Sequence, residues 1–146
     1  MGGGRERVAA DEPRNADALA YLAALEHLPG YVASAAPASV DPWQLGAHPD
    51  LVEQLWQTLD GGLPQRCAWV VHGRACLVRR SSGVVFGLAL GTSGVFLRVP
   101  LARHAELGLG PAARPAVLKG LAPEWVPAPF GAAGARLALA AFEGAA

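Results

Sequence analysis

The sequence predicts an α+β protein in which an antiparallel β-meander of about four strands, residues ~66–99, packs against two to four helices. The apolar residues have helical spacing before residue 61 and alternate with a period of two after residue 66. The connections between the alternating runs are only a few residues long. Such short connections join antiparallel neighbours, because a parallel crossover needs about a dozen residues or more. With 146 residues, 52% of them hydrophobic, the chain has the size of one domain around one core.

The N-terminal region predicts a tail followed by a helix. Residues 1–14 are rich in glycine and then in charges, and they predict a flexible tail, whereas residues 15–146 are expected to form a single globular α+β domain. Asn15 is placed to cap a first helix from Ala16 to about Leu28, which a proline–glycine pair ends. The stretch from residue 31 to residue 47 has no period and predicts a connecting loop.

A second helix is expected from His48 to Asp60. His48 can cap it, Pro49 suits its first position, and a glycine pair after Asp60 supplies the exit. Apolar residues recur with helical spacing along one side. The polar positions of this helix are expected to face water: Glu53, Gln54, Gln57 and Asp60.

Four runs with strand character follow. They are Cys67–His72, Ala75–Arg80, Val84–Leu90 and Val95–Val99. The segments between them are short and rich in glycine and serine, with the chemistry of hairpin turns. The third run is expected to place Val84, Phe86, Leu88 and Leu90 on one face, and Val85, Gly87 and Ala89 on the other. The small residues of the second face would let a helix approach closely, so both faces of the sheet are expected to be covered.

The C-terminal third predicts two further helices and a loop. Pro100 opens a short helix that runs to Leu107, and residues 109–133 form a proline- and glycine-rich loop that Trp125 anchors. The chain ends in an alanine-rich helix, Ala135–Glu143. The side chains of this helix that are available for docking are Leu137, Leu139 and Phe142.

The composition bears on origin and partners. Lys119 is the only lysine, Asn15 is the only asparagine and isoleucine is absent, a bias that predicts a high-GC genome and a bacterial origin. The formal net charge of +0 and the low charged fraction of 16% favour self-association or a partner surface; the alternative is that alanine, glycine and proline simply fill the surface. The arginines are scattered, which argues against nucleic-acid binding.

The sequence predicts a reduced, cytoplasmic protein. No apolar segment follows the N-terminal charges, so no signal peptide is expected. The longest uncharged run, Ser81–Leu97, is short for a membrane span and contains four glycines, so no membrane association is expected. Two cysteines are too few for the disulfide framework of a small secreted domain.

No catalytic residue, metal ligand or cofactor is predicted. Cys67 and Cys76 are expected to share one face of a hairpin but to lie diagonally, too far apart for a disulfide, and to be buried core thiols. The histidines lack the spacing of a helical metal site. The motifs of serine hydrolases, phosphate loops and dinucleotide-binding domains are absent from the sequence.

His72 and three arginines make a candidate ligand site. His72 lies at a hairpin tip and is followed by Arg74, and Arg80 and Arg98 end nearby strands, so these four residues could form an edge that binds an anion or another small molecule. The alternative is an ordinary turn, with arginines that deter edge-to-edge aggregation. We expect the alternative to hold.

The sequence alone favours a non-catalytic binding or accessory protein that acts through protein–protein contacts. It could act as a homodimer or in a complex, and an immunity-type or antagonist protein is one version. Trp43 is the predicted partner contact, since tryptophan is enriched in interface hot spots. The alternatives are the small-molecule or anion-binding domain and an enzyme of unfamiliar type that uses Cys67 or His72.

Overall fold

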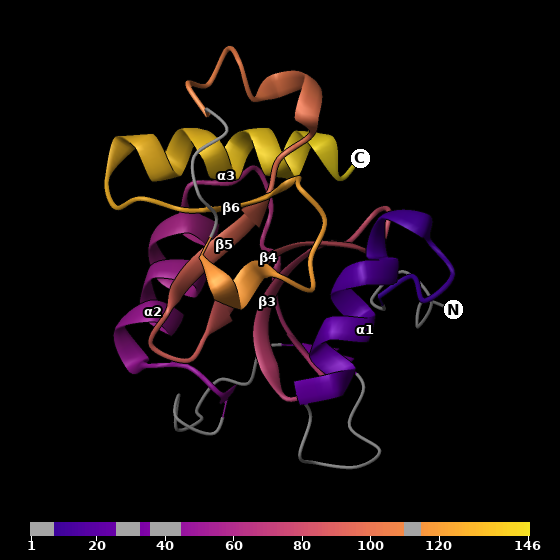
Figure 1. Cartoon of the computed structure of the whole chain (residues 1–146). Coiled ribbons are helices and arrows are strands. Elements are labelled where there is room, and N and C mark those ends of the chain that lie inside the picture. Colours follow the sequence, from indigo (N-terminus) through magenta and orange to yellow (C-terminus); the bar gives the residue numbers. More distant parts are fainter. Residues whose placement is uncertain (1–7, 26–32, 36–44, 110–114) are drawn as a thin grey trace.

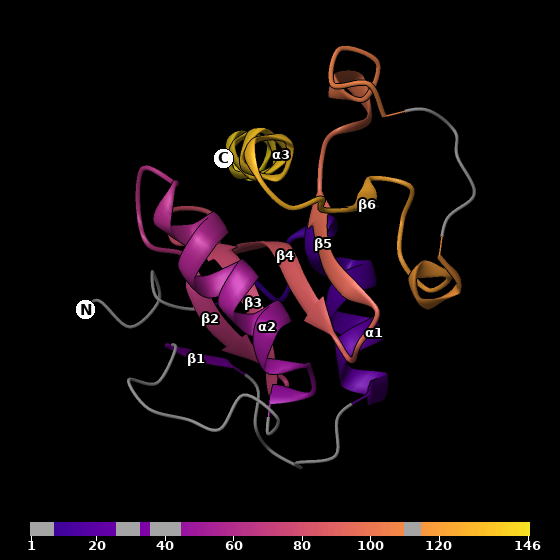
Figure 2. The same ribbon diagram turned by 90° about the vertical axis from the view of Figure 1, so that its left-hand side faces the viewer.

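The computed structural model describes residues 8–25, 33–35, 45–109 and 115–146. Its centre is one antiparallel sheet of six strands whose spatial order is the order of the chain, β1-β2-β3-β4-β5-β6 (Figures 1 and 2). The strands are β1 (Ala33–Ala35), β2 (Ala68–Val71), β3 (Arg74–Arg79), β4 (Val84–Leu90), β5 (Gly94–Arg98) and β6 (Trp125–Pro127). The predicted α+β meander is therefore confirmed, with more strands than expected. The two additional strands, β1 and β6, have three residues each and lie at the sheet edges, and three residues are too few to reveal a period.

Three helices and three short turns complete the fold. The helices are α1 (Ala16–Leu25), α2 (Pro49–Glu53) and α3 (Ala132–Gly144). The turns are 3-10 turns at Pro13–Asn15, Leu101–Arg103 and Ala116–Leu118. The helix expected from Pro100 to Leu107 is thus only one 3-10 turn followed by irregular turns. The final helix begins three residues earlier than expected, and the expected end of the first helix lies outside the described residues.

Helices cover both faces of the sheet (Figure 2). The α2/α3 core lies between α2, α3 and one face, and the α1 core lies between α1, the segment 117–122 and the other face. All seven residues of β4 are buried, because β4 is a central strand and supplies side chains to both cores. The expectation that both faces are covered is confirmed.

A β-bulge in β4 shifts its side chains between the two faces. Leu77 pairs with Gly87 and Val78 pairs with Val85, so Phe86 is an extra residue without a partner on β3. Before the bulge the faces are as predicted, with Phe86 in the α2/α3 core and Val85 in the α1 core. After it the prediction is wrong. Leu88 and Leu90 lie in the α1 core, whereas Ala89 lies in the α2/α3 core.

Gly87 allows the strands to approach at this bulge. A Cβ atom at Gly87 would lie 2.9 Å from Cγ of Leu77, so the leucine occupies the space that a side chain would need. The sequence predicts that the small residues of β4 let a helix approach closely. At Gly87 the structure shows that it is the neighbouring strand β3 that approaches closely.

The hairpin between β2 and β3 turns at His72 and Gly73, as the sequence predicts. Val71 pairs with Arg74, and the two turn residues have φ values of 49° and 75°. Two consecutive residues in the left-handed region make the type I′ turn that matches the twist of antiparallel strands.

Asn15 does not cap α1. It is fully buried, and its amide nitrogen donates to the carbonyl oxygens of Ala9 (2.8 Å) and Gly83 (2.9 Å). Its oxygen accepts from the N–H of Val85 at 2.8 Å. Because the N–H of Ala9 also donates to Gly83, the described residues before Asn15 lie against the β3–β4 hairpin, although the sequence placed them in the tail 1–14.

The second helix begins as predicted and then widens. Nδ1 of His48 accepts from the N–H of Asp50 at 3.0 Å, which confirms the predicted cap. Beyond Glu53 the helix becomes π-helical over Gln54–Leu59, and the wider turn changes which residues face the sheet. Gln54 and Asp60 are consequently buried, at 5% and 3% exposure, whereas the sequence placed both in water.

We predict that Asn15 is a principal polar determinant of stability. Asn15→Ala leaves one buried N–H without its acceptor and removes two donors, which should lower the free energy of unfolding by about 1–3 kcal/mol. Asn15→Asp should cost more, because a second carboxylate oxygen would face two carbonyl oxygens. Urea unfolding measures both values, with Asp11→Ala as the exposed control, expected within about 0.5 kcal/mol of wild type. An Asn15→Asp variant as stable as wild type would contradict this role.

Candidate functional site

The four residues of the predicted anion site lie at opposite ends of the sheet. His72 and Arg74 are at the tip of the β2–β3 hairpin, and Arg80 follows the far end of β3. Arg98 ends β5, which runs toward the same end as β3 because both pair antiparallel with β4. The structure therefore brings together only two pairs, His72 with Arg74 and Arg80 with Arg98 by strand end, and not the set of four.

The three arginines at these positions differ in the contacts that their side chains make within the protein. Arg74 donates to the carbonyl oxygen of Gly46 at 2.9 Å and to that of Leu25, the last residue of α1, at 3.2 Å. Arg98 lies 3.7 Å from a carboxylate oxygen of Glu124, with only 12% of its side chain exposed. Arg80 is exposed. Two of the three guanidinium groups thus hold segments of the chain together. Trp43, the predicted partner contact, lies outside the described residues.

Both cysteines are buried free thiols, but they do not share a face. Cys67 lies in the α2/α3 core and Cys76 in the α1 core; Cys67 precedes β2, so the alternation of the strand does not determine its face. Burial raises the pKa of Cys67 to about 12, with a further rise from the nearby Asp60 carboxylate. Burial also raises the pKa of Cys76. Neither sulfur has the thiolate character that a nucleophile needs.

Asp60 is the buried acidic residue among the described residues, and its carboxylate accepts a hydrogen bond from the backbone. Its Oδ1 accepts from the N–H of Cys67 at 2.6 Å, which joins the end of the π-helical segment to the start of β2. Burial raises the pKa of this carboxyl, and hydrogen bonds from the backbone partly offset the rise. Across the ranges that the structure describes, no group of three or more histidine, cysteine, aspartate or glutamate side chains could hold a metal ion.

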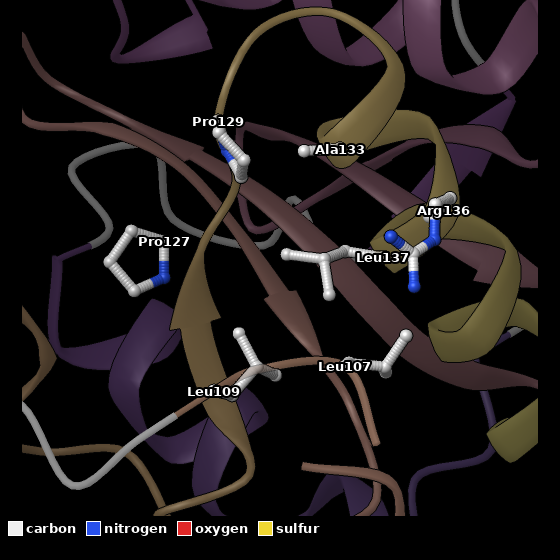
Figure 3. Close-up of a pocket in the computed structure, with 7 residues that line it drawn as sticks. All are labelled: Leu107, Leu109, Pro127, Pro129, Ala133, Arg136 and Leu137. Carbon is white, nitrogen blue, oxygen red and sulfur yellow. The ribbon is translucent and has the colours of Figure 1, made fainter. Parts of the chain in front are cut away.

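The described surface is hollowed beside α3. An open groove of about 280 Å³ runs between α3, the segment that follows β5 and the segment that follows β6 (Figure 3). Apolar side chains line it together with one arginine: Leu107, Leu109, Pro127, Pro129, Ala133, Arg136 and Leu137. Arg136 is exposed, and its guanidinium group makes no ion pair or hydrogen bond within the described part of the chain.

Three large apolar side chains are exposed on α3 or near its two ends. Phe130, just before α3, is 74% exposed; Leu139, in the middle of α3, is 41% exposed. Leu101 is 55% exposed and lies near the C-terminal end of α3, where Pro100 contacts Gly144. We refer to the groove together with Leu101, Phe130 and Leu139 as the α3 face. Leu25 is the one other large hydrophobic residue that is exposed among the described residues.

The position of α3 is fixed by two arginines at its C-terminal end. Nη1 of Arg79 donates to the carbonyl oxygen of Phe142 at 2.8 Å, and its guanidinium lies 4.0 Å above the ring of the same residue. Arg14 donates to the carbonyl oxygens of Gly144 and Ala146, both at 3.0 Å. Positive charge is favourable here because the unpaired carbonyls of the last turn carry partial negative charge.

Two further contacts shape the edges of the α3 face. Arg103 forms ion pairs with Glu106 and with Glu143 (3.1 Å), which holds the segment after β5 along α3. A Cβ atom at Gly134 would lie 2.0 Å from the carbonyl oxygen of Pro129, so only glycine lets this loop lie against the helix. The wall of the groove therefore depends on a residue type without a side chain.

The α3 face could not be recognised from the sequence pattern. Leu137, Leu139 and Phe142 were expected to be available for docking of the last helix; Leu137 and Phe142 are buried under α3, whereas Leu139 is exposed. Phe130 and Leu101 were missed. The available signal was Phe130 itself, an aromatic residue between Pro129 and Gly131 in a segment without strand or helix pattern.

We predict that both native thiols react slowly. Alkylation of the folded protein at neutral pH should be slow at Cys67 and Cys76, because both are buried and protonated, and should become rapid once denaturant unfolds the chain. Mass spectrometry of the labelled chain follows both sites. Fast labelling of either cysteine in the folded state would contradict this prediction and would support the alternative that a cysteine acts as a nucleophile.

We predict a pH signature for Asp60. A carboxyl whose pKa is raised in the folded state binds more protons when folded than when unfolded, so its contribution to stability falls as pH rises above the ordinary value of 3.8. The difference in unfolding free energy between wild type and Asp60→Asn should therefore shift against wild type from that pH toward neutrality. Denaturant titrations at several pH values measure it, and a difference that is constant with pH would contradict the assignment.

No helix in the described ranges has the length and apolar character needed to cross a bilayer. Comparison of the chain with protein-family models, with curated proteins and with solved structures gives no match. Its function therefore has to be inferred from its own residues.

Proposed function

We propose that this protein is a non-catalytic binding protein that acts through protein–protein contact at the α3 face. One observation carries the proposal: Phe130, which directly follows the groove-lining Pro129, has 74% of its surface exposed and does not fill the open apolar groove. Grouped apolar side chains on a surface are typical of interaction sites, whereas scattered single ones are not.

The energetics favour a partner at this place. Burial of a phenylalanine or leucine side chain contributes about 1.5–3 kcal/mol, and the α3 face offers three such side chains that its own fold leaves in water. Aromatic anchors near the centre of an interface are common hot spots. Arg136 adds a cation at the rim without an internal partner, so it can specify an acidic group opposite.

The chemistry of the other candidate groups gives no comparable support for an enzyme. Cys67 and Cys76 are buried with raised pKa values, and Asp60 is engaged with the backbone of Cys67. The anion-binding alternative is also less well supported, because Arg74 and Arg98 are occupied by internal contacts. A cytoplasmic location remains part of the proposal, in keeping with two thiols that are not joined to each other.

We predict that substitutions in the α3 face release a partner without unfolding the chain. Native mass spectrometry of the protein isolated from its source should show a complex. Phe130→Ser and Leu139→Glu should each weaken it at least about 30-fold, as hot-spot residues do, because both remove exposed apolar surface that the monomer does not need.

The matched control is Gln57→Glu, an exposed position on the π-helical segment outside the face, which should leave the complex intact. Thermal melting checks that each variant is folded. Trp43→Ala tests the contact that the sequence predicts. A chain isolated only as a monomer, or a complex that neither α3-face variant weakens, would refute the proposal.

A further inference from the structure

We propose that the partner of the α3 face is the α3 face of a second copy of this chain, with the two α3 helices packed antiparallel about a two-fold axis near Leu139. This assignment rests on the proposed function, because it names what occupies the same face. Three independent features of the face support it: the order of its apolar side chains, the order of its charges and its position at the periphery of the fold.

The exposed apolar side chains lie near both ends of α3 and in its middle. Phe130 lies two residues before the helix, Leu139 lies in its middle, and Leu101 lies beside its C-terminal end, where Pro100 contacts Gly144. When two such helices pack antiparallel, the ends exchange places. Phe130 of each copy then meets Leu101 of the other, and the two Leu139 side chains meet at the axis. A two-fold interface requires this kind of self-complementary surface.

The exposed charges of α3 are opposite in sign on the two sides of Leu139. Arg136 and Glu143 are exposed on one side of the helix, seven residues or about two turns apart, and Leu139 lies between them. Their midpoint is halfway between residues 139 and 140. Antiparallel packing about that point therefore places each Arg136 opposite Glu143 of the second copy, so two ion pairs form. Parallel packing would place like charges opposite each other.

The charges available within one copy favour this pairing. Arg136 makes no internal ion pair in the described ranges, and Glu143 uses Oε1 for Arg103 at 3.1 Å, which leaves its other oxygen for a second cation. The other exposed residues of the same stripe are small: Ala132 and Ala135. Small side chains let two helices approach closely enough for Leu139 to contact its counterpart.

The position of α3 leaves this surface accessible. Seen end-on in Figure 2, α3 lies at the periphery, with α2 on one side and β5 and β6 on the other, and no described helix or strand lies beyond it. Figure 1 shows the whole length of α3 across the upper part of the molecule, with the segment that follows β5 above it. The formal net charge of +0 means that two copies approach without net repulsion.

The test exchanges the two charges of the predicted pair. Wild type should show a monomer–dimer equilibrium in sedimentation velocity runs at micromolar concentrations. Arg136→Glu and Glu143→Arg should each weaken dimerisation on the order of tenfold, since one substitution acts at both symmetric contacts. An equimolar mixture of the two single variants should restore it, because each then meets an opposite charge at both contacts.

A cross-linking experiment tests whether the two-fold axis passes near Leu139. Leu139→Cys should form a disulfide-linked dimer on mild oxidation, because the native thiols are buried and the new thiol faces its counterpart. Gln57→Cys, exposed outside the face, is the control and should remain mostly monomeric.

The outcomes separate this assignment from the proposed function. A wild-type chain that stays monomeric, single variants that remain weak when mixed, or Leu139→Cys that cross-links no faster than Gln57→Cys would each overturn the second copy as partner. If the endogenous protein is then found with an unlike subunit that Leu139→Glu releases, the proposed function stands. If the endogenous protein is found without any partner, both the second copy and the proposed function are refuted.

Discussion

The burial of β4 on both faces is the constraint on which the rest of the structure depends. All seven of its residues are buried, so both faces of the sheet centre must be covered, by α2 and α3 on one side and by α1 with the segment 117–122 on the other. A sheet covered in this way has no open face for a ligand. Its edges are strands of only three residues, and Pro127 removes one backbone donor from β6. Binding surface is therefore left to the outer sides of the helices and the loops beside them.

Long-range polar contacts determine which helix side is left outside. Asn15 joins the N-terminal segment to the β3–β4 hairpin, and Arg79 at the end of β3 holds the last turn of α3 through Phe142. Arg14, one residue before Asn15, reaches the same helix end. The orientation of α3 thus follows from the N-terminal segment and one hairpin together. Because Leu137 and Phe142 point into the core in this orientation, Leu139 and Arg136 must point outward.

Sequence patterns predicted those parts of the fold that local chemistry determines. The four central strands, the turn at His72 and the cap at His48 depend on residues close to one another in the chain, and they were predicted within a residue or two. The bulge at Phe86, the π-helical turns and the partners of Asn15 depend on contacts between distant segments, which a period cannot reveal. The burial of Leu137 and Phe142 could be foreseen from the pattern of the last helix, but the exposure of Phe130 could not, because nothing in a proline-rich loop shows whether an aromatic side chain is buried in a core.

The proposed packing of α3 on α3 across a two-fold axis requires contacts between copies at Leu139 and between Phe130 and Leu101. Isotope-filtered nuclear Overhauser spectroscopy on a mixture of labelled and unlabelled chains detects only contacts between copies. It should show the methyl groups of Leu139 close to those of the other copy, and the ring of Phe130 close to Leu101. Cross-copy signals confined to other elements, or none at concentrations where the chain sediments as a dimer, would contradict this arrangement.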